Sequence, residues 1–183
     1  SLNSDVDTTL FLRSSRKGLI SRKIYIKGYF QNFNLVRNSY KEISELRNTI
    51  ESNEIYSLIG LLNKKSVLAL HIRGGDFLNT NWRNLVGVLS PTYFANAISL
   101  AKSLCYIEEI WIFTNDRKYV STFSNDLPLP IRIIDSNEYK SPVDSFLLMG
   151  KCKAIVASNS TFSYLAAFMS EIPEVVIIPS MFS

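Results

Sequence analysis

Polar residues gather after three apolar segments of the chain, and their types suit the binding of a negatively charged ligand. Arginine and histidine donate hydrogen bonds, serine and threonine add hydroxyls, and glycine lets a ligand approach the backbone closely. If the apolar segments are parallel strands of one sheet, their polar ends meet at one edge. In chain order the groups are His71, Arg73, Gly74, Gly75 and Asp76; Thr114, Asn115 and Asp116; and Ser158, Asn159, Ser160 and Thr161.

The first group lies in the stretch "LALHIRGGDF" and is led by the chain's one histidine. The guanidinium of Arg73 presents a planar set of donors that suits phosphate oxygens; the alternative is a surface turn with an ion pair to Asp76. His71 lies two residues before Arg73, so in a strand both side chains point to the same face. His71 is therefore either a donor beside Arg73 or a hydrogen-bonded residue of the core.

The third group precedes a predicted helix, and Asp144 lies near the start of another. The free N–H groups of a helix N-terminus attract phosphate. Ser160 and Thr161 would add hydroxyl donors there, and an ordinary helix cap is the alternative. The carboxylate of Asp144 either stabilises the start of its own helix or accepts two N–H bonds from the edge of a guanine base.

The order of the predicted elements indicates how these groups are positioned. From residue 66 onward, apolar segments alternate with helical patterns, which predicts βαβ units and a Rossmann-like, doubly wound, mainly parallel α/β sheet. The continuous apolar run at 66–72 is typical of a strand covered on both faces. The predicted strands are 66–72, 109–116, 131–135, 154–160 and 174–179, and the predicted helices are 54–62, 90–104, 117–124, 141–150 and 161–169.

Before this domain we expect a connecting segment at 1–53, with a strand at 23–30 and a helix at 35–50. Residues 8–41 include eight basic residues and no acidic one. Such a segment can attract nucleic acid, anionic lipid or a pyrophosphate-linked substrate, and a solvated face is the alternative. Because few aromatic residues are interleaved with the basic ones, we expect no nucleic-acid partner.

Composition narrows the class of protein. Apolar residues make up 46% of the 183 residues and charged ones 20%, which allows a buried core. No apolar run reaches the roughly 18 residues of a membrane span, and the N-terminus does not resemble a signal peptide. Cys105 and Cys152 form no disulfide framework or metal quartet, which favours buried thiols in a reducing compartment. The first residue is not Met, which suggests a fragment of a longer protein.

Several common site motifs are missing from the sequence. There is no G-x-G-x-x-G of nicotinamide dehydrogenases and no G-x-x-x-x-G-K-[ST] of P-loop NTPases. There is no G-x-S-x-G elbow, and no further histidine remains for a serine–histidine triad. A lone histidine also argues against a His-rich metal site.

The three polar groups, in this order, resemble those of the α-1,2-fucosyltransferases, the family 11 glycosyltransferases. The stretches "HIRGGD", "IFTND" and "SNSTFSYLAAF" are similar to that family's His-x-Arg-Arg-Gly-Asp block, its Phe-Ser-Asp-Asp strand end and its Asn-Ser-Thr-Phe-Ser segment. The stretches "GYFQNFNLV", "GVLSPTYFANAI" and "DSFLLMGKCKAI" are similar too. The resemblance covers about residues 24 to 182, and it implies a GDP-sugar-binding domain of the GT-B type at 54–183.

The resemblance implies an inverting transfer of fucose from GDP-fucose to a galactoside hydroxyl, in surface-glycan or O-antigen synthesis. It implies a donor sugar nucleotide and a glycan acceptor as partners, no metal and no further cofactor, and a cytoplasmic enzyme at the inner face of the membrane. Arg73 would bind the β-phosphate, and Ser160 and Thr161 would hold the pyrophosphate. Asp144 would read guanine, and His71 would contact the nucleotide.

Further residues are assigned by the same resemblance or by location. Arg73 and Asp76 are the candidate catalytic residues. Asp76 and Asp116 are candidates for the general base by location alone, and local turn capping is the alternative for both. The other expected contacts to GDP-fucose are Gly74, Gly75, Thr114, Asn115, Asp116, Asn159, Phe162 and Ser163.

The chain departs from the family pattern in three places. Gly74 stands at the position of the second arginine, which removes a cation near the diphosphate. The glycine-rich N-terminal portion that helps to build the acceptor cleft is missing, and Tyr164 and Leu165 replace an aromatic pair. Two other hypotheses therefore stay open: a non-catalytic GDP- or phosphosugar-binding module, and a domain whose polar strand ends bind nothing.

Overall fold

The computed structural model describes residues 55–75, 89–134, 141–170 and 172–179. The strand predicted at 23–30, the helix predicted at 35–50 and the basic segment at 8–41 lie outside these ranges, as does Asp76. The division of the chain at residue 53 therefore stays a prediction.

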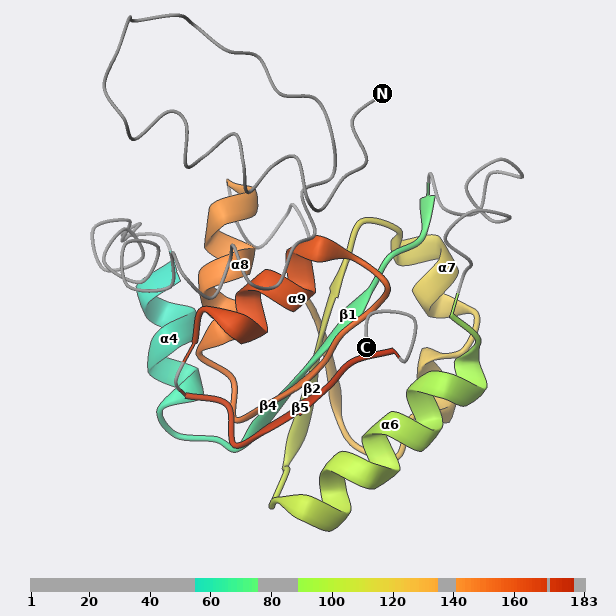
Figure 1. The fold of residues 1–183 in the computed structure, drawn as a ribbon, viewed down its shortest axis with the longest axis horizontal. Helices are drawn as coiled ribbons and strands as arrows, with labels where there is room; N and C mark the ends of the chain where they lie inside the picture. The colour runs from blue at the N-terminus through green and yellow to red at the C-terminus, as the bar shows by residue number, and fades with distance from the viewer. Residues whose placement is uncertain (1–54, 76–88, 135–140, 171, 180–183) are drawn as a thin grey trace, which may run out of the picture. The chain divides into compact units, whose positions relative to one another are not determined.

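In the described ranges, five parallel strands form one sheet in the order β3-β2-β1-β4-β5 (Figure 1). The chain builds outward from β1 to β3 and then returns to the other side of β1. This is the order of a Rossmann sheet, whose ligands bind where the direction reverses. We call the carboxyl ends of β1 and β4, at Ile72 and Val156, the switch point. The strands are β1 (Val67–Ile72), β2 (Glu109–Thr114), β3 (Ile131–Ile134), β4 (Ala154–Val156) and β5 (Val175–Ile177).

Helices cover both faces of this sheet (Figure 1). The buried side chains of α6 and α7 join one core cluster, and those of α4, α8 and α9 join the other. No helix in the described ranges is long and apolar enough to cross a membrane. The helices are α4 (Tyr56–Leu62), α6 (Pro91–Leu104), α7 (Arg117–Ser121), α8 (Pro142–Gly150) and α9 (Thr161–Phe168), with a short 3-10 turn, η3, at Ser124–Asp126.

Strand β1 is buried along its whole length, as its apolar run predicts. Successive side chains alternate between the two cores because a strand has a period of two residues. His71 falls on the α9 side, where its ring lies 5.7 Å from the ring of Phe162. Leu68, Leu70 and Ile72 join the core with α6, and Val67 and Ala69 join the core with α4, α8 and α9.

Strand β5 is shorter than the predicted 174–179, and two further strands end early because polar residues at their ends leave the sheet. Strand β4 stops at Val156 rather than at residue 160, since Ser160 turns away to cap α9. Strand β2 stops at Thr114 rather than at residue 116, since Asp116 caps α7. In both cases the last residue of the predicted strand is the cap of the next helix instead.

Two predicted helix starts are confirmed. Ser90 caps α6 and accepts a hydrogen bond from the Tyr93 N–H at 3.2 Å, with proline in the first turn. Ser141 caps α8 in the same way, accepting from the Val143 N–H at 3.2 Å, again followed by proline. Proline fits there because the first N–H groups of a helix have no partner within it.

The two cysteines are free thiols in different surroundings. Cys152 is fully buried in the core with α8, and burial raises the pKa of its thiol. Cys105, at the end of α6, is partly exposed. The prediction of buried thiols is therefore right for Cys152 and wrong for Cys105.

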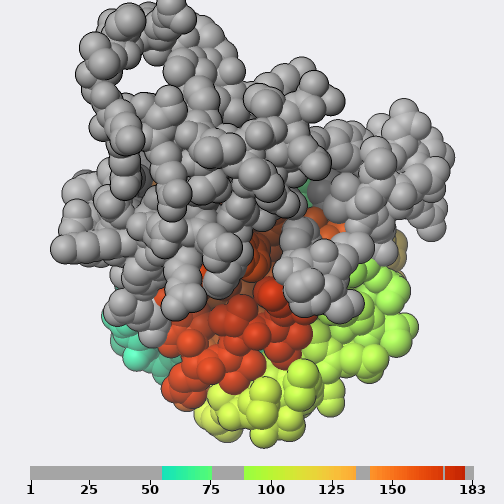
Figure 2. Space-filling model, in the orientation of Figure 1, coloured from blue at the N-terminus to red at the C-terminus, as the bar shows by residue number. Residues whose placement is uncertain are grey.

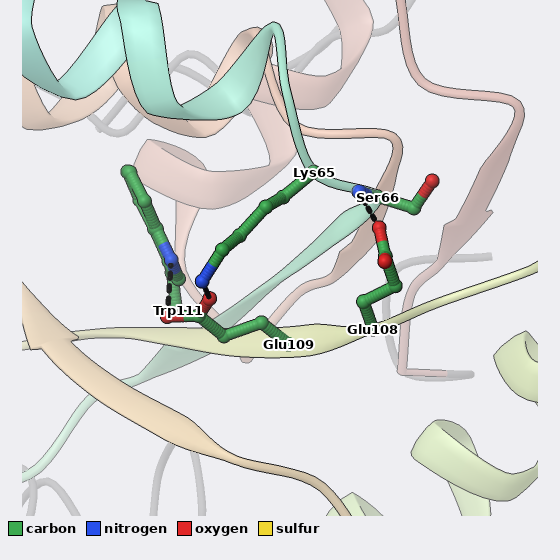
Figure 3. A network of polar contacts seen from close by, with 5 residues as sticks. All are labelled: Lys65, Ser66, Glu108, Glu109 and Trp111. Atoms are coloured by element: carbon green, nitrogen blue, oxygen red, sulfur yellow. Dashed lines mark hydrogen bonds and ion pairs between the residues drawn. The ribbon is translucent and has the colours of Figure 1, made fainter.

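Polar contacts tie the amino ends of β1 and β2 together (Figure 3). Lys65 Nζ lies 2.5 Å from Glu109 Oε2, and the indole N–H of Trp111 donates to Glu109 Oε1 at 3.1 Å. The Ser66 N–H donates to Glu108 Oε2 at 2.8 Å. The Lys65 side chain is half exposed, so its ion pair adds little stability. Trp111 is 1% exposed, so the satisfied indole N–H and the buried ring matter more.

Replacing Trp111 by alanine should lower the free energy of unfolding by about 3–5 kcal/mol, because it leaves a cavity in the core. Urea denaturation of the full chain measures this change. Tyr106→Ala is the matched control, since Tyr106 is 70% exposed and should change stability by no more than about 0.5 kcal/mol. Equal effects of the two variants would contradict the assignment of Trp111 to the core.

Candidate functional site

A buried hydrogen bond joins the ends of β1 and β4 at the switch point. His71 Nδ1 lies 2.7 Å from Ser158 Oγ, and the two residues expose 6% and 2% of their surface. Ser158 comes two residues after the end of β4, so the bond connects the two strands between which ligands bind in this fold. His71 is thus a hydrogen-bonded core residue, as one of the two interpretations of the sequence has it, and it lies at the predicted site.

Burial and the positive charge of Arg73 lower the pKa of His71 to about 3. The imidazole is therefore neutral near pH 7, with one N–H donor and one acceptor nitrogen. Arg73 follows directly after β1 and is partly buried. A neutral donor and a guanidinium thus lie near each other at the switch point, which is a suitable pair for an anion.

Side chains after β2 hold the glycine turn, which we define as Gly74 and Gly75. The Gly74 N–H donates to Asn115 Oδ1 at 3.0 Å, and the Gly75 N–H donates to Asp116 Oδ2 at 2.9 Å. Gly75 has a φ of 58°, in the left-handed region that glycine adopts without a Cβ penalty. These two side chains therefore fix the backbone that follows Arg73.

The carboxylate of Asp116 is engaged on both oxygens. Its Oδ1 accepts from the Tyr119 N–H at 2.9 Å, in the cap of α7. The N–H groups of Tyr119 and Gly75 lower the pKa of Asp116. Thr114 Oγ1 in turn accepts from the Asp116 N–H at 2.9 Å. The polar residues after β2 hold the chain's own backbone, and a contact from them to a ligand stays a prediction.

The start of α9 supplies the second side of the site. Ser160 Oγ accepts from the Phe162 N–H at 3.3 Å, and Thr161 begins the helix and is partly exposed. Ser163 is fully buried and donates to the Ser160 carbonyl at 3.3 Å. Asn159 is 3% exposed. Within this group the backbone N–H groups, Ser160 and Thr161 are therefore the parts that are best placed for an anion.

The ring of Phe162 contributes to packing. It lies between the rings of His71 and Phe146, at centroid distances of 5.7 and 5.6 Å. These contacts connect β1, α9 and α8 in one aromatic row. A contact of Phe162 with the sugar nucleotide stays a prediction, while its packing against His71 is observed.

Asp144 is a buried carboxylate in the first turn of α8, with 2% of its surface exposed. Its Oδ2 accepts from the Ser141 N–H at 3.1 Å, in a capping box. Its Oδ1 receives no hydrogen bond from a described residue. Because α8 follows β3 and α9 follows β4, both helices start at the carboxyl edge of the sheet. The capping interpretation therefore holds for one oxygen, and the other has capacity for a ligand.

The model of glycosyl transferase family 11 matches residues 13–183. The chain belongs to this family. A curated relative, the O-antigen biosynthesis glycosyltransferase WbnK of Escherichia coli, is 28% identical over 160 residues, which are 82% of this chain and 52% of WbnK. The chain thus spans about half the length of this relative.

Solved structures share the fold. Crystal structures of POFUT1 with GDP and with GDP-fucose each align with a TM-score of 0.51 at 12% sequence identity. The alignments cover 75% of this chain and 51% and 50% of the POFUT1 chains. At this identity the likeness shows the fold alone, and it confirms the Rossmann-like, GT-B-type class predicted from the sequence.

In this member of glycosyl transferase family 11, the glycine turn leaves no room for a side chain at residue 74. A Cβ on Gly74 would lie 2.7 Å from Asp116 Cβ and 3.0 Å from its Oδ2, closer than such atoms approach one another. Asp116 cannot simply rotate away, because its two oxygens hold Gly75 and Tyr119. The glycine at the position of the expected second arginine is therefore a requirement of local packing.

Sequence reasoning missed two residues of the site. The sequence places Ser158 in a polar group but indicates no role for it; the signal that points to it is its place at a strand end beside the strand of the lone histidine. Nothing in the sequence singles out Tyr93. Its hydroxyl donates to the Ala157 carbonyl at 3.0 Å and ties the start of α6 to the end of β4, and burial raises the pKa of Tyr93 to about 12.

Adding a side chain at residue 74 should destabilise the chain. We expect Gly74→Ala to lower the free energy of unfolding by about 1–3 kcal/mol, because the new Cβ overlaps Asp116. Gly60→Ala is the control: Gly60 lies within α4 and a Cβ there meets nothing within 4 Å, so the change should stabilise by about 0.5–1 kcal/mol. The same sign for both variants in urea denaturation would contradict the proposed crowding.

His71 should make the stability of the chain depend on pH. It is the one histidine of the chain, so no second histidine contributes to this dependence. The unfolded state gains a proton near pH 6.5, and the folded state gains it only near pH 3. The contribution of His71 to stability is therefore fully present above pH 6.5 and is lost as the pH falls below that value. From pH 7 to 5.5 we expect a loss of about 1 kcal/mol, which His71→Gln should abolish. A wild-type stability that is flat over this range would show that folded His71 binds a proton as readily as the unfolded chain does.

Proposed function

We propose that this chain is the GDP-fucose-binding part of a glycosyltransferase that transfers fucose to a galactoside hydroxyl with inversion. The observation that carries the proposal is the arrangement of His71 and Arg73 beside the start of α9 at the switch point. Helix N–H groups and a guanidinium both favour an anion. Membership of glycosyl transferase family 11 supports the diphosphate of a sugar nucleotide as that anion.

In the proposed reaction the departing GDP gains negative charge. The bond from the sugar to the β-phosphate oxygen breaks, its electron pair stays with the diphosphate, and the sugar becomes oxocarbenium-like. Fixed donors aimed at that charge lower the barrier, typically by about 2.7–4 kcal/mol for one donor. Arg73 is proposed as the main donor, and Ser160, Thr161 and the first N–H groups of α9 as the others.

In the proposed complex, the carboxylate of Asp144 binds the guanine base of the donor. A guanine edge presents two neighbouring N–H donors, which match a carboxylate. The Oδ1 of Asp144 receives no hydrogen bond from a described residue, and the group is 2% exposed. Buried acceptors normally have a hydrogen-bond partner, and the N–H groups of a bound guanine would supply one for Oδ1.

The acceptor hydroxyl must lose a proton, and the assignment of a base rests on position. Asp76 is proposed because it follows the glycine turn in sequence. Asp116 suits this role less well, because its pKa is lowered and its oxygens accept from Gly75 and Tyr119. A carboxylate that is stabilised in this way is a weak base.

The biological setting follows from what the relatives are called. WbnK is an O-antigen biosynthesis glycosyltransferase, and POFUT1 has been crystallised with GDP-fucose. The first name supports surface-glycan synthesis and the second supports GDP-fucose as the donor; an α-1,2 linkage and a place at the cytoplasmic face of the membrane are part of the proposal. No metal and no cofactor besides the donor are included in it.

One observation favours a second candidate, a non-catalytic module that binds GDP or a phosphosugar. Asp116 crowds residue 74, so no second arginine can stand beside Arg73 without rearrangement. A single cation stabilises a departing diphosphate less than two do. Transfer assays on the full-length protein separate the candidates: GDP release with fucosylated lactose as product supports the enzyme, and GDP binding without turnover supports the module.

Replacing Arg73 should weaken GDP binding. Charge-assisted hydrogen bonds contribute about 1.5–3 kcal/mol, so we expect Arg73→Ala to raise the Kd for GDP by roughly 10- to 100-fold in calorimetry. Arg132→Ala is the matched control, because Arg132 is on β3 and its side chain lies over the ring of Trp111. The Kd of this variant for GDP should stay within about twofold of the wild type. Equal GDP affinity in wild type and Arg73→Ala would rule out the role of Arg73.

A further inference from the structure

The surroundings of Ser158 decide which partner carries the proton in its bond to His71. A hydroxyl can donate or accept, and so can a neutral imidazole nitrogen. If His71 Nδ1 donated, the Ser158 O–H would need another acceptor, and no described residue besides His71 bonds to this hydroxyl. Ser158 is 2% exposed, and a buried hydroxyl without an acceptor is costly. Donation from Ser158 to Nδ1 satisfies both groups.

We propose that Ser158 is a positioning residue that holds His71 in the neutral tautomer with its proton on Nε2. His71 is 6% exposed, and its Nε2 bonds to no described residue. The fixed Nε2–H is then a donor that awaits an acceptor from outside the described chain. Its use toward an oxygen of the nucleotide diphosphate rests on the function proposed above.

A neutral donor suits this position for an electrostatic reason. A protonated His71 would place a buried cation near Arg73, and the two would repel each other. A neutral N–H adds a hydrogen bond to the ligand without that repulsion. Ser158 thus determines how the histidine contributes, and the ring of Phe162 limits where it points.

The chain has one histidine, so selective labelling with 15N-histidine reports on this residue alone. In the wild-type chain we expect a pyridine-like signal for Nδ1 and a pyrrole-like signal for Nε2, unchanged from pH 8 to pH 5. A protonated Nδ1 would overturn the proposal, and so would fast exchange between the two tautomers. This measurement needs no variant and no ligand.

Variants test the cause of the tautomer. In Ser158→Ala the Nδ1 loses its donor, and we expect averaged nitrogen signals or the opposite tautomer, whereas Ser158→Thr keeps the hydroxyl and should keep the wild-type signals. Ser124→Ala removes another buried serine, 6% exposed and in η3 next to Phe123 of the other core, and should leave the signals unchanged. Wild-type signals in folded Ser158→Ala would overturn the role of Ser158.

Calorimetry with GDP separates this inference from the proposed function. We expect Ser158→Ala to weaken GDP binding by about 10-fold, as for the loss of one good hydrogen bond, and Ser124→Ala to bind like the wild type. A changed tautomer with unchanged GDP affinity would overturn the use of Nε2–H as a donor. A wild-type chain with the expected tautomer but no GDP binding would overturn the proposed function and leave the tautomer assignment supported.

Discussion

Strand β1 is buried on both faces, and this constraint places the polar chemistry of the molecule. A strand between two layers of helices carries polar side chains where it leaves those layers, or inside them only where a hydrogen-bond partner is present, because an unpaired polar group in the core is costly. Polar groups after β1, β2 and β4 therefore gather at the carboxyl edge of the sheet. In the space-filling view, segments from the middle of the described chain (green to yellow) and from its end (red) lie next to one another on the visible face (Figure 2). The candidate site is a consequence of how the sheet is covered.

The residues at this edge divide into those that hold the backbone and those that can reach a ligand. Asn115 and Asp116 accept from the glycine turn and fix the path of the chain after Arg73. Their contribution is the positioning of a neighbouring element, which resembles the support that outer groups give to binding residues in preorganised sites. The same contacts exclude a side chain from residue 74. The Asp116 side chain thus both fixes the backbone after Arg73 and excludes a second arginine from residue 74.

His71 shows how one residue can belong both to a core and to a site. Its ring packs against Phe162, and its Nδ1 is bonded to Ser158. Burial keeps the imidazole neutral, and Arg73 reinforces this effect. A low proton affinity removes His71 from acid–base chemistry near pH 7 but leaves it one N–H donor. The site therefore combines a permanent cation, a neutral donor and a helix N-terminus, each of which favours an anion.

The sequence alone determined the α/β class, the parallel strands, the starts of α6 and α8 and the family, because periodicity and motifs are local signals. It also grouped the polar strand ends at one edge, since a parallel sheet requires this. It could not decide what each side chain does there. Only the tertiary structure shows that Asp116 holds Gly75 and that Ser158 bonds to His71, 87 residues away in the chain. Such partners are set by strand order and register, which bring distant residues within hydrogen-bond distance and leave no periodic trace in the sequence.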